Sequence, residues 1–287
     1  MSPRAYLELI RPPNVTTAIA DVLAGYAVAG LGHPRALAPL VFATMCLYAG
    51  GVALNDVFDL DVDRVERPER PIPSGRLTRR SAAAFGAGLL GAGVLLASLA
   101  GSGTGLAALA TTGCILLYDS WGKRQTWLGP VNMGLCRAGN LMLGVATVPA
   151  ALSWAWPLGL LPLTYIAAVT AVSRGEVHGG RRAVAGAALI FLGTVLLALF
   201  WLSSRPVLSI AGITLTVLLA ARLLPAYAAV WRTPAPETIR TAVRTGVLSL
   251  VLLDATLGAI YAGALYGAGI LGIALTAGWL ARRFAVT

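Results

Sequence analysis

The sequence predicts an all-α membrane protein, a bundle of nine transmembrane helices with a further apolar run that could form a tenth at the C-terminus. Three observations predict this fold. Of the 287 residues, 57% are hydrophobic and only 12% are charged. The 33 glycines suit membrane helices, because small residues let neighbouring backbones approach closely. Apolar runs long enough to cross a bilayer core of about 30 Å recur along the chain.

The nine predicted helices are apolar runs of roughly 20 residues separated by polar connections. They cover approximately residues 13–32, 36–58, 80–100, 103–120, 128–149, 155–175, 183–203, 207–230 and 242–264. The run that could form a tenth helix covers residues 267–281. Because no soluble appendage or low-complexity linker separates the runs, we expect residues 1–287 to form one integral membrane domain.

Basic residues fall on alternate connections. The segment before the first predicted helix and every second connection after it hold 16 Lys and Arg residues, whereas the opposite connections hold only Arg35 and Arg205. Short cytoplasmic loops of membrane proteins carry an excess of Lys and Arg. The pattern predicts a multi-pass protein of the cell membrane, with the N-terminus and the loops of the candidate site in the cytoplasm.

The net charge of +10 would suggest a nucleic-acid partner in a soluble protein. Here the basic residues lie between apolar segments and form no soluble patch with interleaved aromatic side chains. The charge is therefore explained by orientation in a lipid bilayer, and we expect no nucleic-acid partner.

The connection after the second predicted helix concentrates the charge. Residues 56–80 hold 12 charged side chains, and six of the chain's 12 acids lie among them. If the helix continues, Asn55, Asp59 and Asp63 share one face at a spacing of four residues, with Asp56 beside Asp59. Like charges stacked in this way destabilise a helix, so the stripe predicts a bound cation. Hard oxygen ligands suit Mg²⁺, which also takes substrate phosphates, and we expect a metal-diphosphate site.

A rigid arginine-rich segment follows the acids. Three prolines within residues 67–76 restrict the backbone and place Arg67, Arg70 and Arg76 near the carboxylates. Their guanidinium groups could bind phosphate oxygens that the metal leaves free. The same arginines permit a second interpretation, a solvated acidic helix end that they neutralise.

The pattern Asn55-Asp56-x-x-Asp59-x-x-x-Asp63, followed by the Arg-Pro-rich segment, resembles the first motif of the UbiA superfamily of intramembrane prenyltransferases. The resemblance implies that Mg²⁺ holds an isoprenyl diphosphate, which ionises and passes its chain to a small-molecule acceptor. It implies that Asp56, Asp59 and Asp63 bind the metal and that Asn55 helps to hold the diphosphate. Asp59 and Asp63 are also expected to be catalytic.

The connection after the fourth predicted helix adds two cations. Lys123 and Arg124 could neutralise the charge that builds on a departing diphosphate, a catalytic role for Lys123 and a binding role for Arg124. Tyr118 is expected to contact the substrate. The family often has three residues between this Tyr and this Lys, whereas four separate Tyr118 and Lys123 here. Membrane anchoring alone is the alternative for both cations.

Arg137 and Asn140 lie within the fifth predicted helix. An Arg at membrane depth costs about 2.5–3.5 kcal/mol, so its side chain should face a partner or a cavity. Two interpretations stay open, a substrate-binding cavity and a structural ion pair. The acids available for such a pair are Asp21, Asp119 and Asp254.

The end of the sixth predicted helix departs from the resemblance. UbiA enzymes usually carry a second aspartate-rich motif there, but residues 173–182 contain one acid, Glu176, among several cations. We expect Arg174, Glu176 and His178 to bind substrate, either by direct contact of arginine with the diphosphate or in a site that lacks a second metal. This stretch and the region around Arg137 resemble the EboC-like branch of the superfamily.

The leading hypothesis is a Mg²⁺-dependent membrane prenyltransferase that moves an isoprenyl group from a polyprenyl diphosphate to an acceptor. A terpene cyclase of the same superfamily is the first alternative, because it would use the same donor. The second alternative is a non-catalytic protein that binds or translocates a lipid-like precursor. The missing second motif is the observation that supports this last hypothesis.

Overall fold

The computed structural model describes residues 3–205 and 208–281, and this part of the chain forms helices, turns and loops without a strand. Ten of its helices have 14 or more residues. They are α2 (Pro12–Val28), α3 (Leu37–Phe58), α5 (Arg79–Ala100), α6 (Ser102–Ser120), α7 (Leu128–Val145), α9 (Leu160–Ser173), α10 (Arg182–Ser203), α11 (Ile210–Arg232), α12 (Pro236–Ala262) and α13 (Ala264–Ala281). Each matches one predicted run, and α13 occupies the possible tenth.

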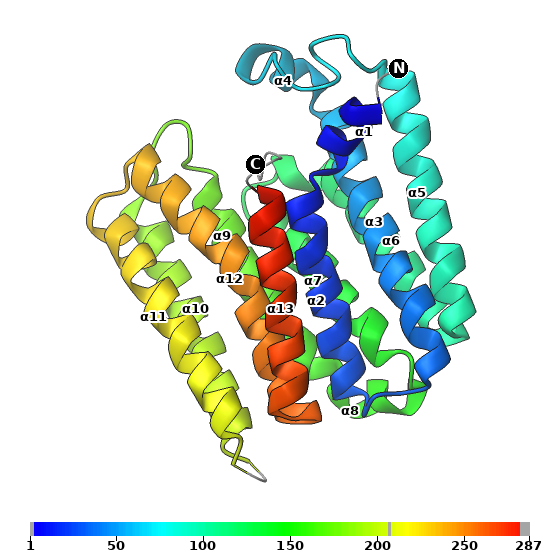
Figure 1. The fold of residues 1–287 in the computed structure, drawn as a ribbon. Helices are drawn as coiled ribbons and strands as arrows, with labels where there is room; N and C mark the ends of the chain where they lie inside the picture. Colours follow the sequence, from blue (N-terminus) through cyan, green and yellow to red (C-terminus); the bar gives the residue numbers. More distant parts are fainter. Residues whose placement is uncertain (1–2, 206–207, 282–287) are drawn as a thin grey trace.

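Three short helices lie outside these runs, α1 (Pro3–Ile10), α4 (Leu60–Glu66) and α8 (Leu152–Ala155). Figure 1 shows the long helices standing side by side, with α1 and α4 at one end and α8 at the other. The loops α9–α10 and α11–α12 lie at the end that carries α4. The charged connections therefore share one end of the molecule, as their alternation along the chain predicts.

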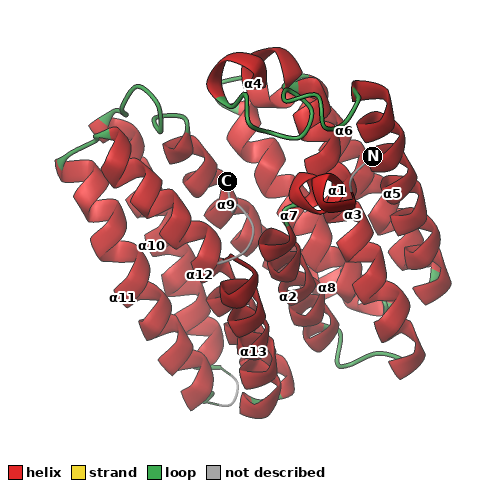
Figure 2. Ribbon diagram, turned by 45° about the horizontal axis from the view of Figure 1, so that its top comes forward, coloured by secondary structure: helices red, strands yellow, loops and turns green. Residues whose placement is uncertain are grey.

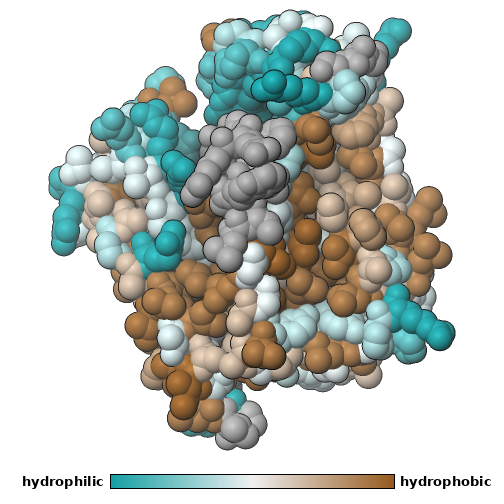
Figure 3. Space-filling model, in the orientation of Figure 1, coloured by the Kyte–Doolittle hydropathy of each residue, from teal (hydrophilic) through white to brown (hydrophobic). Residues whose placement is uncertain are grey.

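The outer surface between the two ends is apolar. Six stretches of the described chain are long and apolar enough to cross a membrane. They are Pro34–Phe58, Arg79–Ala100, Pro149–Ser173, Arg182–Ser203, Ile210–Arg232 and Pro236–Ala262, with shorter apolar helices at Asn14–Val28 and Ala264–Ile273. Large side chains such as Leu99, Leu197 and Leu265 are exposed, and Figure 3 shows a broad hydrophobic surface below a hydrophilic end. The chain is a multi-pass integral membrane protein.

Helices α2 and α7 join two groups of packed helices. Buried residues of α9–α12 form one core with Ala20, Ala24 and Leu141, while α3 and α5 form another with Val22 and Leu143. Figure 2 shows α2 between α13 and α3, at the centre of the array. Because α2 and α7 contribute to both cores, they fix the position of one group against the other.

The contact between α2 and α7 depends on glycine. A Cβ atom at Gly144 would lie 2.2 Å from the carbonyl oxygen of Val22, and one at Gly25 would lie 2.0 Å from that of Leu141. Both distances are far below van der Waals contact, so neither position accepts a side chain unless the backbones move apart. This close packing is the use of small residues that the composition predicts.

The acidic connection is a helix with a one-residue interruption. Helix α3 ends at Phe58 and α4 begins at Leu60, with Asp59 between them. The amide of Asp59 still donates to the carbonyl of Asn55 (2.9 Å), and that of Asp63 to the carbonyl of Asp59 (2.8 Å). The predicted continuous helix is therefore bent at Asp59 and not stopped there.

The proline-rich segment after α4 folds back over α3. The amide of Leu77 donates to the carbonyl of Pro71 (2.9 Å), which closes the segment into a compact turn. Ile72 and Leu77 are buried against Val57 and other apolar residues of α1, α3 and α4. This packing holds the arginines of the segment at the end of α3.

Candidate active site

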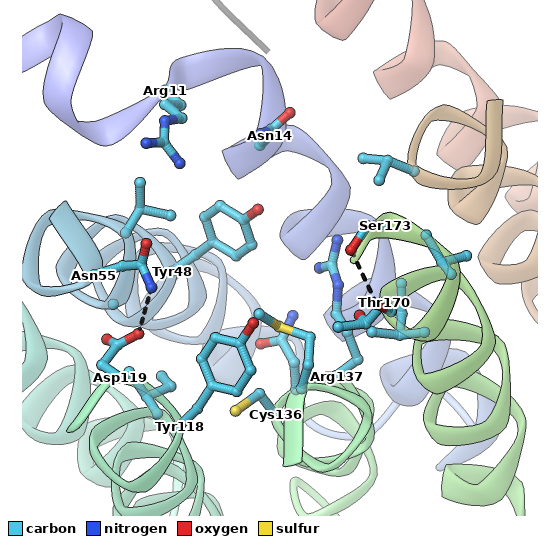
Figure 4. Close-up of a pocket in the computed structure, with 18 of the residues that line it drawn as sticks. Arg11, Asn14, Tyr48, Asn55, Tyr118, Asp119, Cys136, Arg137, Thr170 and Ser173 are labelled. Carbon is cyan, nitrogen blue, oxygen red and sulfur yellow. Dashed lines mark hydrogen bonds between the residues drawn. The ribbon is translucent and has the colours of Figure 1, made fainter. Parts of the chain in front are cut away.

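A cavity of about 330 Å³ opens between helices α2, α3, α6, α7, α9 and α12. Its walls combine apolar side chains with several polar side chains near the charged end of the molecule, which Figure 4 shows. Five of the residues expected to bind substrate or metal, or to pair with such residues, line it directly, namely Asn55, Tyr118, Asp119, Arg137 and Asn140. Tyr118, Thr170 and Ser173 also line an adjoining hollow that contains Lys123 and Arg174.

Asp56 and Asp63 are buried carboxylates that share one arginine. The exposed fraction of each residue is 2%. Arg70 donates to Asp63 Oδ2 (2.7 Å) and to Asp56 Oδ1 (3.3 Å). The two acids lie seven residues apart, so their side chains project from the same side of two successive helical turns. The proline-rich segment thus places Arg70 beside the carboxylates, as predicted.

Arg11 is a second partner of Asp56, and the sequence reasoning missed it. Its guanidinium donates to Asp56 Oδ1 at 2.6 Å. Arg11 joins α1 to α2 with a φ of 48°, in the left-handed region that non-glycine residues rarely adopt. Burial lowers the pKa of Arg11, and the Asp56 carboxylate opposes this shift. The only sequence signal was its position directly before Pro12-Pro13 at the start of a helix.

Asp59 faces a different cation. Its Oδ1 lies 2.7 Å from Lys123 Nζ, and its side chain is 30% exposed. Lys123 reaches this position because the chain after α6 turns through the short 3-10 helix Gly122–Arg124. The extra residue between Tyr118 and Lys123 therefore does not remove Lys123 from the acidic segment. Arg124 is exposed and lines neither hollow.

Asn55 and Asp119 form a polar contact at the cavity wall. Asn55 Nδ2 donates to Asp119 Oδ1 at 2.9 Å, as Figure 4 shows. Asp119 Oδ2 is buried and has no hydrogen-bond partner among the described residues. Asn55 thus turns toward α6, and Asp119, which the sequence offered as a partner for Arg137, belongs to this contact.

Arg137 forms a buried ion pair and also lines the cavity. Its guanidinium donates to Asp21 Oδ2 at 2.6 Å and lies 5.3 Å from the centroid of the Tyr48 ring. Asn140 donates to the same Asp21 oxygen at 2.9 Å. The ion pair is therefore confirmed, and Arg137 also forms part of the cavity wall, while substrate binding by Arg137 stays a prediction.

Asp254 lies against Asp21 and has no cation of its own. It is fully buried, its carboxyl group meets that of Asp21, and no cation, hydroxyl or amide of the described residues donates to it. Two buried acids therefore lie together, and of the two only Asp21 contacts the guanidinium of Arg137. Sequence alone could not select Asp21 over Asp254, because both lie within apolar helices.

In the connection between α9 and α10, Arg174 is the one of the three expected substrate-binding residues that lines a hollow. Arg174 donates to the backbone carbonyls of Gln125 (2.9 Å) and Lys123 (3.4 Å). Glu176 is half-buried. Burial raises the pKa of its carboxyl group, while Arg67 and Arg240 oppose the rise. His178 is exposed and lines neither hollow.

Two of the three arginines expected beside the acids lie farther out. Arg67 comes within 3.9 Å of Asp63, and its side chain is 42% exposed. Arg76 pairs with Glu8 of α1 and not with the aspartates. Of these three arginines, only Arg70 is therefore tightly bound to the acidic segment.

The acidic segment fits Mg²⁺ by donor type, but its acids are paired with cations. Carboxylate oxygens are preferred Mg²⁺ ligands, and Asp56, Asp59 and Asp63 lie within two helical turns. Among the described residues, no three His, Cys, Asp or Glu side chains converge closely enough to hold a metal ion. The expected row of carboxylates is therefore divided. Asp56 and Asp63 form ion pairs with arginines, Asp56 with Arg11 and both with Arg70, whereas Asp59 pairs with Lys123. Phosphate oxygens could take over these cations and release the carboxylates.

A sequence model of the UbiA prenyltransferase family matches residues 16–243. The chain belongs to this family. Curated relatives include digeranylgeranylglyceryl phosphate synthases of Methanopyrus kandleri, 41% identical over 163 residues, and Ignicoccus hospitalis, 34% identical over 179 residues. The matches cover 55% and 61% of this chain but only 59% and 58% of the relatives. These relatives are digeranylgeranylglyceryl phosphate synthases and do not support the narrower EboC-like assignment.

Solved structures share the fold. A structure of digeranylgeranylglyceryl phosphate synthase in membranes has a TM-score of 0.68 at 22% identity, covering 91% of this chain and 98% of its own. A UbiA homologue of Archaeoglobus fulgidus bound to GPP and Mg²⁺ has a TM-score of 0.62 at 16% identity, covering 88% and 99%. At these identities the likeness establishes a UbiA-like membrane bundle for this chain.

Proposed function

We propose that the chain is a membrane prenyltransferase that forms an ether from an isoprenyl diphosphate and an isoprenoid glycerol phosphate. The named relatives support geranylgeranyl diphosphate as donor and geranylgeranylglyceryl phosphate as acceptor. The observation that carries the proposal is an apolar-walled cavity next to the acidic segment: Arg11 lines the cavity and pairs with Asp56, and Lys123 lines the adjoining hollow and pairs with Asp59. An isoprenoid chain and a diphosphate need these two environments side by side.

The donor is placed with its diphosphate at the α3–α4 end and its chain in the cavity. Arg11, Arg70 and Lys123 would bind diphosphate oxygens, because charge-assisted hydrogen bonds from these cations are stronger than neutral ones. Asp56, Asp59 and Asp63 would then be free to hold Mg²⁺. Bound there, the metal would neutralise charge on the leaving diphosphate.

The reaction breaks the bond between the donor's terminal carbon and its diphosphate oxygen and forms a bond from that carbon to the acceptor hydroxyl oxygen. The hydroxyl proton is lost, and diphosphate leaves. Lys123 is proposed to bind the departing diphosphate, since its ammonium group lies at the rim beside Asp59. The apolar wall would keep water from the reactive carbon, which favours transfer over hydrolysis.

The topology proposed with this function has the long helices crossing the bilayer and the acidic mouth in the cytoplasm of the cell. The one-sided arrangement of basic connections supports it. Single cysteines at Arg80 and Arg205, probed with a membrane-impermeant thiol reagent in intact cells, test it. We expect labelling at position 205 only, and the reverse pattern would contradict the orientation.

The activity is tested with the full chain in lipid nanodiscs, labelled geranylgeranyl diphosphate and geranylgeranylglyceryl phosphate. We expect an ether product and diphosphate release that require Mg²⁺ and stop with EDTA. A hydrocarbon formed without acceptor would indicate the cyclase. Thermal stabilisation by the donor, without turnover of donors of several lengths, would indicate a binding or translocating protein.

A further inference from the structure

The α9–α12 side of the cavity rim carries arginines without acidic partners. Arg174 directly follows the last residue of α9, and Arg244 lies in α12. Within the described residues, neither forms an ion pair with a carboxylate, although Arg174 contacts two backbone carbonyls. The side chain of Arg244 has no hydrogen bond to another described residue. Two guanidinium groups thus remain available for an anion.

Both arginines border one connected space. Arg244 lines the main cavity, and Arg174 lines the adjoining hollow with Lys123. The two spaces share Thr170 and Ser173 of α9, which Figure 4 shows across the cavity from Asn55 and Asp119. Arg244 therefore belongs to the α9–α12 side of the cavity, and Arg174 lies between this side and α4, whose Glu66 lines the same hollow.

The wall below these arginines is apolar. Ile166 and Val169 of α9 and Val243 and Val247 of α12 line the cavity on this side. A ligand with a hydrocarbon chain and an anionic head could lie along this wall with its head at the rim. Its head would meet guanidinium groups that need no displacement from a carboxylate.

The opposite rim suits the donor. There each cation is already paired with an aspartate, and the three carboxylates give the segment its capacity for a metal. A phosphate monoester needs no metal if two guanidinium groups face it, because arginine binds phosphate through paired N–H donors. The charge distribution therefore separates two anionic heads between the two rims.

We propose that Arg174 and Arg244 bind the phosphate group of the acceptor and place its isoprenoid chain along α9 and α12. This assignment rests on the proposed function, in which the acceptor is a phosphorylated lipid. Arg174 also holds the backbone at Lys123, so acceptor binding at this point would be linked to the loop that carries the leaving-group cation.

The test compares Arg244→Ala with the wild-type full chain in nanodiscs. The acceptors are geranylgeranylglyceryl phosphate and its dephosphorylated alcohol. Arg244→Ala should raise the KM for the phosphorylated acceptor roughly tenfold to a hundredfold, with a much smaller change in the donor KM. The preference for the phosphorylated acceptor over the alcohol should shrink by the same factor.

Arg240→Ala is the matched control. Arg240 lies one helical turn before Arg244, is exposed, and lines neither hollow. It should leave the acceptor preference as in the wild type. Arg174→Ala should reduce the preference as Arg244→Ala does, while Arg244→Lys should restore part of it.

Two results would overturn the assignment. One is an equal loss with the phosphorylated acceptor and the alcohol. The other is a rise in the donor KM as large as that in the acceptor KM, which would place the arginines on the donor diphosphate. If the wild-type protein turns over no pair of donor and acceptor, the proposed function fails. Thermal stabilisation by geranylgeranylglyceryl phosphate then tests whether Arg174 and Arg244 form a phosphate-binding site. Stabilisation that Arg244→Ala removes supports the site, and equal or absent stabilisation of both proteins refutes it.

Discussion

The two rims of the cavity differ in how their charged side chains are paired. On the α3–α4 rim, the buried aspartates are matched by Arg11 and Arg70, and Asp59 is matched by Lys123. On the α9–α12 rim, Arg174 and Arg244 are left without acids, and their side chains lie where water or an anion can reach them. The paired rim is neutral until a ligand exchanges the partners, whereas the unpaired rim attracts anions directly.

The largest expected effect comes from removing acids of the paired rim. Asp59→Ala combined with Asp63→Ala should reduce prenyl transfer by at least about 10³-fold, because the proposed mechanism requires these carboxylates to hold the metal-diphosphate. Steady-state product formation measures the loss. Asp61→Ala is the matched control, since the Asp61 side chain is 88% exposed and pairs only with Arg64. A double variant that turns over as fast as the wild type would show that the site is elsewhere.

Substitutions in the buried cluster of Asp21, Arg137 and Asp254 are expected to change the stability of the protein. Arg137→Leu leaves Asp21 and Asp254 without a cation and should lower the apparent Tm by roughly 5–15 °C. Asp254→Asn removes one uncompensated acid and should leave Tm the same or raise it. If the two substitutions lower Tm equally, the placement of two acids beside one guanidinium is wrong.

A smaller stability effect is expected at Arg70. Arg70→Ala leaves Asp56 and Asp63 side by side without their shared cation, and the apparent Tm should fall by roughly 3–6 °C. Solvent near the rim limits the effect. Arg67→Ala should change Tm by no more than about 1 °C, because its longer contact with Asp63 is exposed. Similar decreases in Tm for both variants would mean that Arg70 stabilises Asp56 and Asp63 no more than Arg67 does.

The smallest effect concerns pH at the unpaired rim. Because burial raises the pKa of Glu176 above its ordinary value of 4.5, the folded protein binds this proton more tightly than the unfolded chain. Stability from this group should therefore be lost as pH rises from about 4.5 through the raised pKa. Glu176→Gln should flatten that part of a Tm-against-pH curve, and the effect should be small because Glu176 is only half-buried. An unchanged curve would argue against a buried carboxyl at Glu176.

Most of the fold could be predicted because apolar length sets the helices. The expected runs 80–100 and 103–120 correspond to α5 at Arg79–Ala100 and α6 at Ser102–Ser120. The apolar run predicted a helix over residues 242–264, but α12 begins earlier, at Pro236. Its first turn is polar, so hydropathy alone does not mark it. Short α1 was missed because it is not a long apolar run, and α4 was expected only as a continuation of the helix before it.

The site could be predicted only as far as residue type and local spacing allow. The motif located Asp56, Asp59 and Asp63, and the proline-rich segment located Arg70. Spacing could not show that Asp59 turns away from the other two, since its partner Lys123 lies 64 residues later. The contact of Arg11 with Asp56 and the position of Arg244 likewise depend on how helices pack, which no local pattern records.

The ratio of ether product to released diphosphate, measured with the wild-type chain, geranylgeranyl diphosphate, geranylgeranylglyceryl phosphate and Mg²⁺, tests the proposed transfer most directly. Transfer between the two rims predicts a ratio of about one and no diphosphate release above background after EDTA. Diphosphate released at the same rate without any ether product, or no release at all, would contradict it.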